Sequence, residues 1–60
     1  MTYCYTREVV RPGQPSLVTT VESCARTRDE LERWVAGWNR SELEHCARQQ
    51  TPPRFIYRVL

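Results

Sequence analysis

Residues 27–50, TRDELERWVAGWNRSELEHCARQQ, decide the fold because two helix-start signals follow one another within them. Residues 27–30 (TRDE) form a capping box, in which the threonine hydroxyl accepts a backbone amide and the glutamate reaches back to the cap. Apolar residues then recur at helical spacing, at Leu31, Trp34, Val35 and Trp38. The pattern predicts an amphipathic helix over about residues 28–38.

The second signal is the stretch SELE at residues 41–44, which repeats the capping box. Leu43, Cys46 and Ala47 follow at the same helical spacing, so a second short helix is predicted over about residues 42–49. The joint at residues 39–41 can be a true break or only a kink. The two prolines at positions 52 and 53 end any helix, because proline lacks the amide and restricts the residue before it.

Strand-like sequence flanks this helical region on both sides. Residues 2–11 alternate in a composition rich in tyrosine, threonine and valine, and residues 17–21 (LVTTV) are rich in β-branched residues. The turn cluster PGQP at 12–15 joins these two segments into an antiparallel hairpin. Residues 55–59 (FIYRV) form a last strand.

The predicted fold is a single α+β domain over residues 1–60. A small three-stranded, mainly antiparallel sheet in the order β-β-α-α-β carries one helical layer on one face, since a hairpin alone is marginal in water. The last strand is expected beside the first. The helical layer is expected to be built on Leu31, Trp34, Val35, Trp38 and Leu43.

Size and composition restrict the classes of function. Sixty residues bury only about 60% of the surface that the unfolded chain exposes, which disfavours an elaborate buried active site. No run approaches the roughly 20 apolar residues of a membrane helix, and no leader-like apolar segment follows Met1, so a cytoplasmic protein without a membrane partner is expected. All nine basic residues are arginine, and the net charge of +2 is too small to indicate nucleic acid by itself.

A metal site is the sharpest chemical alternative, because cysteine and histidine are zinc ligands. The candidates are Cys4, Cys24, His45 and Cys46. Their spacing lacks the paired knuckles of structural zinc sites, and adjacent residues 45 and 46 point to different sides of a helix. No metal and no cofactor are therefore expected, and the pairing state of the three cysteines stays open.

Catalysis is not expected either. A nucleophilic cysteine needs a neighbouring base, and the single histidine lies on another helical face than Cys46. The acidic residues gather near the predicted helix starts, where they favour the helix dipole and pair with arginines four residues on. They are expected to be solvated.

The strands offer a candidate binding surface. Residues 27–49 hold four arginines and five acids, so the positive excess lies in the strands and their ends. An open sheet face with tyrosine for stacking and arginine for phosphate would suit a nucleic-acid-binding module. The alternative is that the tyrosines pack under the helices. The candidate partner-binding residues are Tyr3, Tyr5, Arg7, Arg11, Tyr57 and Arg58.

Protein recognition is the favoured function for the same residues. Tyrosine, tryptophan and arginine are enriched at binding hot spots, and an uncovered sheet face or a free strand edge suits a protein partner or a homodimer. The two functions differ in salt dependence, which is steep for phosphate contacts. The sequence predicts a non-catalytic protein-interaction module, with nucleic-acid binding as the alternative.

In size and element order the chain resembles the small accessory proteins of bacteriophages and mobile elements. Some of these bind and block a host machine, among them anti-CRISPR proteins and inhibitors of host polymerases or nucleases. The resemblance implies a binding function with a host protein as partner. It assigns no role to any residue of this chain.

Overall fold

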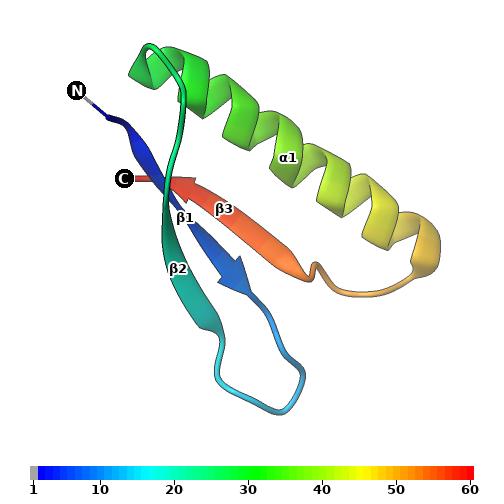
Figure 1. Ribbon diagram of the computed structural model, residues 1–60. Coiled ribbons are helices and arrows are strands. Elements are labelled where there is room, and N and C mark those ends of the chain that lie inside the picture. Colours follow the sequence, from blue (N-terminus) through cyan, green and yellow to red (C-terminus); the bar gives the residue numbers. More distant parts are fainter. Residues whose placement is uncertain (1) are drawn as a thin grey trace.

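The computed structural model describes residues 2–60 and has a small α+β fold. Three strands, β1 (Cys4–Val9), β2 (Leu17–Glu22) and β3 (Phe55–Val59), form one sheet, and a single helix, α1 (Arg28–Gln49), connects β2 to β3 (Figure 1). The strand order is β2-β1-β3, and both pairs are antiparallel. The predicted fold class and the position of the last strand beside the first are confirmed.

The helical region is one continuous helix, so the predicted order with two helices is wrong. The SELE stretch at 41–44 resembles a helix start but lies inside α1. Nothing at residues 39–41 forces a break, because this joint contains neither proline nor glycine. The side chain of Asn39 also bonds to β3, not to the helix backbone.

Both ends of α1 follow the sequence signals. The Thr27 hydroxyl accepts a hydrogen bond from the Glu30 amide at 3.1 Å, as expected for the capping box. At the other end Gln50 adopts a left-handed conformation with φ of 56°, and its amide donates to the Ala47 carbonyl. The chain thus leaves the helix just before the two prolines.

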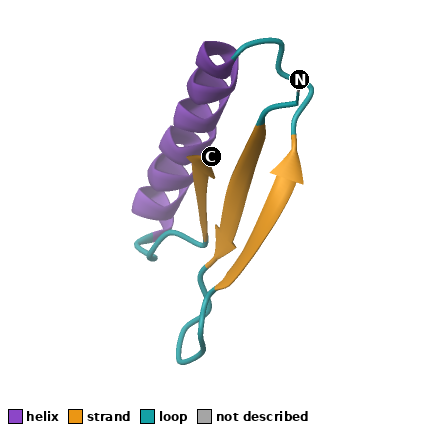
Figure 2. Ribbon diagram, turned by 90° about the vertical axis from the view of Figure 1, so that its left-hand side faces the viewer, coloured by secondary structure: helices purple, strands orange, loops and turns teal. Residues whose placement is uncertain are grey.

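The helix lies over β3 and leaves β2 uncovered. In Figure 2 α1 stands beside the β3 end of the sheet, and β2 forms the far side. Ala25, Leu31 and Val35 are the buried centre of the core, with Tyr3, Tyr5, Trp34, Tyr57 and Val59 packed around them. Within residues 2–60, the helix backbone makes its close approach to β3 and none to β2.

The inward stripe of the helix differs from the predicted one in its second half. Leu43, expected in the core, is 57% exposed, whereas Cys46 is buried. An uninterrupted helix continues the phase of its first turns, and a period of 3.6 residues from the buried Val35 reaches positions 42 and 46. The prediction of a core Leu43 failed because it allowed the second segment a phase of its own.

Candidate interaction surface

The three predicted tyrosines lie on the face of the sheet that the helix covers. The rings of Tyr5 and Tyr57 pack on Trp38 of α1, with centroid separations of 5.1 Å and 5.3 Å. Tyr3 packs against the core cluster. This is the arrangement of the alternative in which the tyrosines pack under the helical layer, so their bodies stabilise the fold and only their edges are open to a partner.

The predicted arginines are not gathered in one place. Arg7 is exposed, and its guanidinium carbon lies 5.9 Å from the centroid of the Phe55 ring. Arg11 instead holds the β1–β2 loop, because its Nη2 and Nε atoms donate to the Pro15 carbonyl at 2.8 Å and 3.2 Å. Arg58 is exposed and lies one residue from Tyr57 on β3, so it points to the opposite face.

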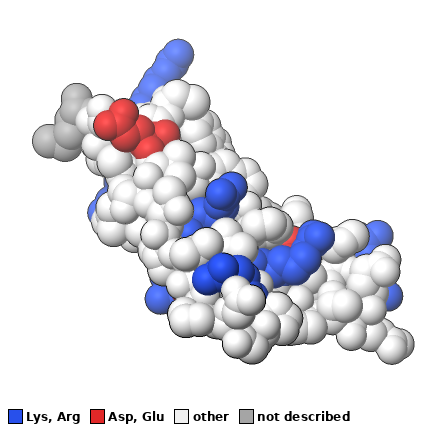
Figure 3. Space-filling view, turned by 60° about the horizontal axis from the view of Figure 1, so that its bottom comes forward, with Lys and Arg blue, Asp and Glu red and all other residues white. Residues whose placement is uncertain are grey.

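A second arginine reaches the same aromatic ring as Arg7. The guanidinium carbon of Arg54 lies 5.6 Å from the Phe55 centroid, a distance at which a cation is attracted to the face of a ring. Arginine side chains gather in the middle of the molecular face that Figure 3 shows, with few acidic atoms among them. The structure thus brings together a basic pair, Arg7 and Arg54, of which the sequence indicated only the first.

A hollow of about 340 Å³ opens where the helix leaves the sheet uncovered. Its walls come from α1, β1, β2 and β3, and the residues that line it are Tyr5, Arg7, Val21, Trp38 and Tyr57. Trp38 remains 37% exposed there. Three of the predicted residues therefore meet at one concave, mainly aromatic site beside β2.

The outer edge of β2 is the most exposed part of the sheet. Leu17 is 52% and Val18 is 63% exposed, and five of the six β2 residues are exposed. The Ser23 amide donates to the Tyr3 carbonyl at 3.0 Å. Hydrogen-bonded and non-hydrogen-bonded pairs alternate along an antiparallel ladder. Counting from the bonded Ser23, every second residue of β2 therefore bonds to β1, namely Val21, Thr19 and Leu17.

The remaining residues of β2, Val18, Thr20 and Glu22, therefore direct their backbone N–H and C=O groups away from β1. In the described part of the chain, β2 is the end strand of the sheet and pairs only with β1. An end strand with unpaired backbone groups is a template for a further strand.

The other edge of the sheet is capped by the helix at its central residue, Tyr57. Asn39 Nδ2 donates to the Tyr57 carbonyl at 2.8 Å, and the Tyr57 amide donates to Asn39 Oδ1 at 2.9 Å. One side-chain amide thus satisfies both backbone groups of Tyr57, as a neighbouring strand would do. The two edges of the same sheet are therefore chemically different.

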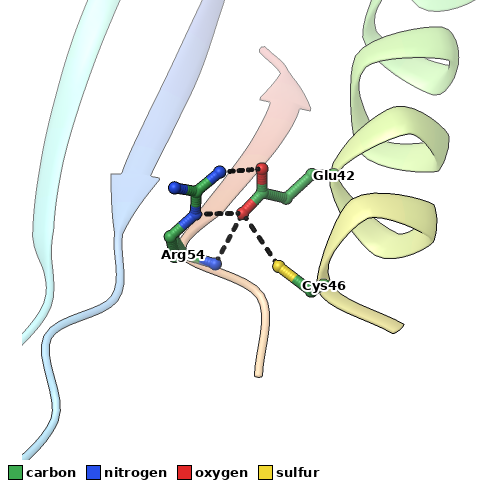
Figure 4. A network of polar contacts seen from close by, with 3 residues as sticks. All are labelled: Glu42, Cys46 and Arg54. Carbon is green, nitrogen blue, oxygen red and sulfur yellow. Dashed lines mark hydrogen bonds and ion pairs between the residues drawn. The ribbon is translucent and has the colours of Figure 1, made fainter. Parts of the chain in front are cut away.

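One helical turn beyond Asn39, Glu42 links the helix to the residue before β3 (Figure 4). Its Oε2 atom accepts from the Arg54 amide at 2.8 Å and from Arg54 Nε at 3.2 Å, and Oε1 accepts from Nη2 at 3.3 Å. The Cys46 thiol donates to the same Oε2 atom at 3.3 Å. The carboxylate side chain is only 10% exposed.

These contacts change the acidity of Glu42. Hydrogen bonds from the Arg54 side chain and then from its backbone amide stabilise the carboxylate, and they lower the pKa of Glu42 from 4.5 to about 2. The same hydrogen bond raises the pKa of Arg54. The pair is therefore charged throughout the neutral range and acts as a structural link between α1 and β3.

The three cysteines are free thiols. Cys46 is buried, Cys4 is half-buried and Cys24 is exposed. His45 is exposed beside Cys46 on the helix. Among residues 2–60, no group of three or more histidine, cysteine or acidic side chains is placed to hold a metal ion.

Sequence patterns alone do not identify Asn39 and Glu42 as the polar residues that join α1 to β3 and to the residue before it. They predict a joint between two helices at position 39 and a solvated helix start at position 42. The available signal was the phase of the Leu31 stripe, which places position 42 on the inward face once the helix is continuous. Nothing local in the sequence marks Asn39 as a partner of β3.

Comparisons with protein-family models, with curated proteins and with solved structures found no match to this chain. Within the described residues 2–60, no helix is long and apolar enough to cross a membrane.

Proposed function

We propose that this chain is a non-catalytic protein-interaction module that binds its partner along the outer edge of β2. The observation that carries the proposal is the contrast between the two sheet edges. Asn39 caps the central residue of the β3 edge, Tyr57, whereas Val18 and Thr20 on β2 direct their backbone groups outward with no such cap. Natural proteins usually protect such an edge unless it has a use.

The side chains of β2 suit strand addition. The LVTTVE sequence is rich in β-branched residues, contains no proline and no basic residue, and exposes Leu17 and Val18 on its two faces. In strand addition the backbone hydrogen bonds supply affinity, and alternate side chains supply specificity. The hollow lined by Tyr5, Arg7 and Trp38 lies beside this edge and offers an aromatic anchor site to the same partner.

The same proposal includes a cytoplasmic location and an origin in a bacteriophage or mobile element. Three free thiols suit a reducing compartment such as the cytoplasm. The small size and the β-β-α-β order fit an accessory protein of a bacteriophage or a mobile element, which would bind a host protein.

The test is capture from nuclease-treated lysate with the tagged wild-type protein and with Thr20→Pro. Proline at position 20 removes an outward amide and no bond to β1, so the fold is retained, which circular dichroism checks. A partner that binds the wild type and not Thr20→Pro supports the proposal. Leu43→Ser, which changes an exposed apolar residue on the helix, is the matched control and is expected to keep the partner.

Equal capture by wild type and Thr20→Pro would overturn the β2 edge as the binding element. Loss of the partner with Leu43→Ser alone would move the interface to the helix.

A second candidate function is nucleic-acid binding, favoured by the Arg7 and Arg54 guanidinium groups, which lie 5.9 Å and 5.6 Å from the Phe55 ring centroid. Guanidinium beside an aromatic ring suits phosphate and stacked bases. Against it, the rings of Tyr5 and Tyr57 already pack on Trp38. Fluorescence anisotropy with a labelled single strand tests this function, which requires affinity that falls steeply with salt and with Arg7→Gln.

A further inference from the structure

We propose that the strand added to β2 is the β2 strand of a second copy, which gives a two-fold symmetric dimer with a continuous six-stranded sheet. The inference rests on the proposed function, since it names the occupant of the same edge, and it leaves the hollow lined by Tyr5, Arg7 and Trp38 as the surface on which the dimer would meet a host protein. It follows from the alternation of backbone groups along β2, from the side-chain pattern of this strand and from the position of the helix.

The side-chain pattern of β2 restricts the register. In an antiparallel pair, residues directly opposite one another point to the same face, so a two-fold axis through the sheet must pass beside a residue and not between two residues. Every such register pairs outward groups of β2, and the two centred nearest the middle of the strand, on Thr19 and on Thr20, pair the most residues of β2.

The register centred on Thr19 pairs apolar and β-branched residues with one another. Leu17 of one copy lies opposite Val21 of the other on the helix side, and Val18 lies opposite Thr20 on the other face. Each Val18–Thr20 pair exchanges two backbone hydrogen bonds, because both residues direct their groups outward. Apolar and β-branched cross-strand pairs stabilise a sheet, so the two exposed large apolar residues of β2, Leu17 and Val18, gain partners.

The register centred on Thr20 is poorer. It sets the apolar Val18 against the carboxylate of Glu22 and leaves Leu17 opposite Ser23, outside the strand. The axis at Thr19 avoids this mismatch and places the only two charges of the paired strands, Glu22 of each copy, at opposite ends of the ribbon. The geometry therefore selects Thr19 as the central residue.

The rest of the fold leaves room for the second copy. The helix packs along β3, which is the strand farthest from the new contact (Figure 2). A two-fold axis perpendicular to the sheet puts both helices on the same face. The two hollows that contain Tyr5 and Trp38 then lie between the helices, over the central strands.

Ribbon pairing through one short strand buries little area, which places the contact at the low end of specific interfaces. A dimer that dissociates on dilution is expected. Sedimentation equilibrium over a wide concentration range measures it, with Thr20→Pro expected to stay monomeric at every concentration.

Cysteine cross-linking tests the register in a Cys4→Ser, Cys24→Ser background, in which the buried Cys46 is retained. At Thr19 the two copies form a non-hydrogen-bonded pair with Cα atoms about 4.5 Å apart, within disulfide range. Thr19→Cys is expected to give a disulfide dimer in a glutathione buffer. Thr20→Cys is expected to give at least tenfold less, because its two copies are offset along the strands.

Equal cross-linking of the two variants, more cross-linking of Thr20→Cys, or a wild type that stays monomeric at millimolar concentration would overturn the proposal. A monomeric wild type that still captures another protein, and loses it with Thr20→Pro, would refute the dimer and leave the proposed function intact. Failure of capture together with a Thr19→Cys dimer would show that the second copy is the occupant and that no other partner is needed.

Discussion

Glu42 links α1 to Arg54, the residue directly before β3. Its carboxylate accepts hydrogen bonds from both the backbone and the side chain of Arg54, and it is the acceptor for the buried Cys46 thiol. An ion pair on an open surface contributes little. This pair differs because the carboxylate is nearly enclosed and also satisfies a backbone amide.

The lowered pKa of Glu42 predicts an acid-dependent loss of stability. The unfolded chain takes up the proton near pH 4.5 and the folded chain only near pH 2, so the unfolded state binds more protons between these values. The stabilisation is complete above about pH 5 and is lost as the pH falls through 2. Urea unfolding at several pH values is the measurement.

The comparison uses Glu42→Gln, which is expected to be less stable than the wild type at pH 7 and to approach it as the pH falls. Glu44→Gln changes an exposed carboxylate on the same helix and serves as the control. A wild-type advantage over Glu42→Gln that stays constant down to pH 2 would contradict this role of Glu42.

Asn39 has a comparable effect farther along the same strand, at Tyr57 of β3. Asn39→Ala leaves the amide and carbonyl of Tyr57 without their partner, which is expected to cost about 1–3 kcal/mol in the free energy of unfolding. Chemical denaturation measures it. Ser41→Ala, two residues along the exposed side of the helix, is expected to change stability by no more than about 0.5 kcal/mol.

At the scale of elements, the continuity of α1 has consequences for Gly37. This glycine lies inside the helix, and within the described residues nothing is closer than 4 Å to the position that a Cβ atom would occupy. Gly37→Ala is therefore expected to stabilise the protein by about 0.5–1 kcal/mol. A destabilised Gly37→Ala in thermal unfolding would argue for a bend at this position.

Gly13 in the β1–β2 loop provides a control of opposite sign. Its φ of 73° is a conformation that residues with a Cβ adopt at a cost. Gly13→Ala is expected to destabilise the protein although it also has open space around it.

The three strands and both ends of the helix could be predicted from the sequence, but the continuity of the helix could not. The strands, the cap at Thr27 and the helix end near Gln49 followed from local signals, because caps, prolines and β-branched runs act over a few residues. Continuity of the helix did not follow, since a capping-box pattern at 41–44 costs little inside a helix. Whether such a pattern is used depends on packing against β3, which is not local.

The candidate site was predicted less well for a related reason. Period-two alternation placed Tyr3, Tyr5 and Arg7 on one face correctly, but could not say that the helix covers that face over β1 and β3 and leaves β2 open. The contrast between the two edges depends on one tertiary contact, Asn39 with Tyr57, for which the sequence carries no local signal.

At the scale of the whole molecule, charge and interface are separate. The net charge of +2 comes from arginines outside β2, and β2 itself carries only Glu22. Dimer formation through β2 is therefore expected to depend little on salt, because no phosphate or ion pair takes part in it. Sedimentation at low and high sodium chloride checks this, with Arg7→Gln and Arg58→Gln expected to leave the dimerisation constant unchanged.

Residue-resolved amide hydrogen exchange of the dilute wild-type protein tests the difference between the β2 and β3 edges most directly. The Thr19 and Tyr57 amides are expected to be protected, the first by β1 and the second by Asn39. The Thr20 amide is expected to exchange rapidly and to gain protection as the concentration rises. A Thr20 amide as slow as that of Thr19 at high dilution, or a Tyr57 amide as fast as that of Thr20, would contradict the difference between the two sheet edges.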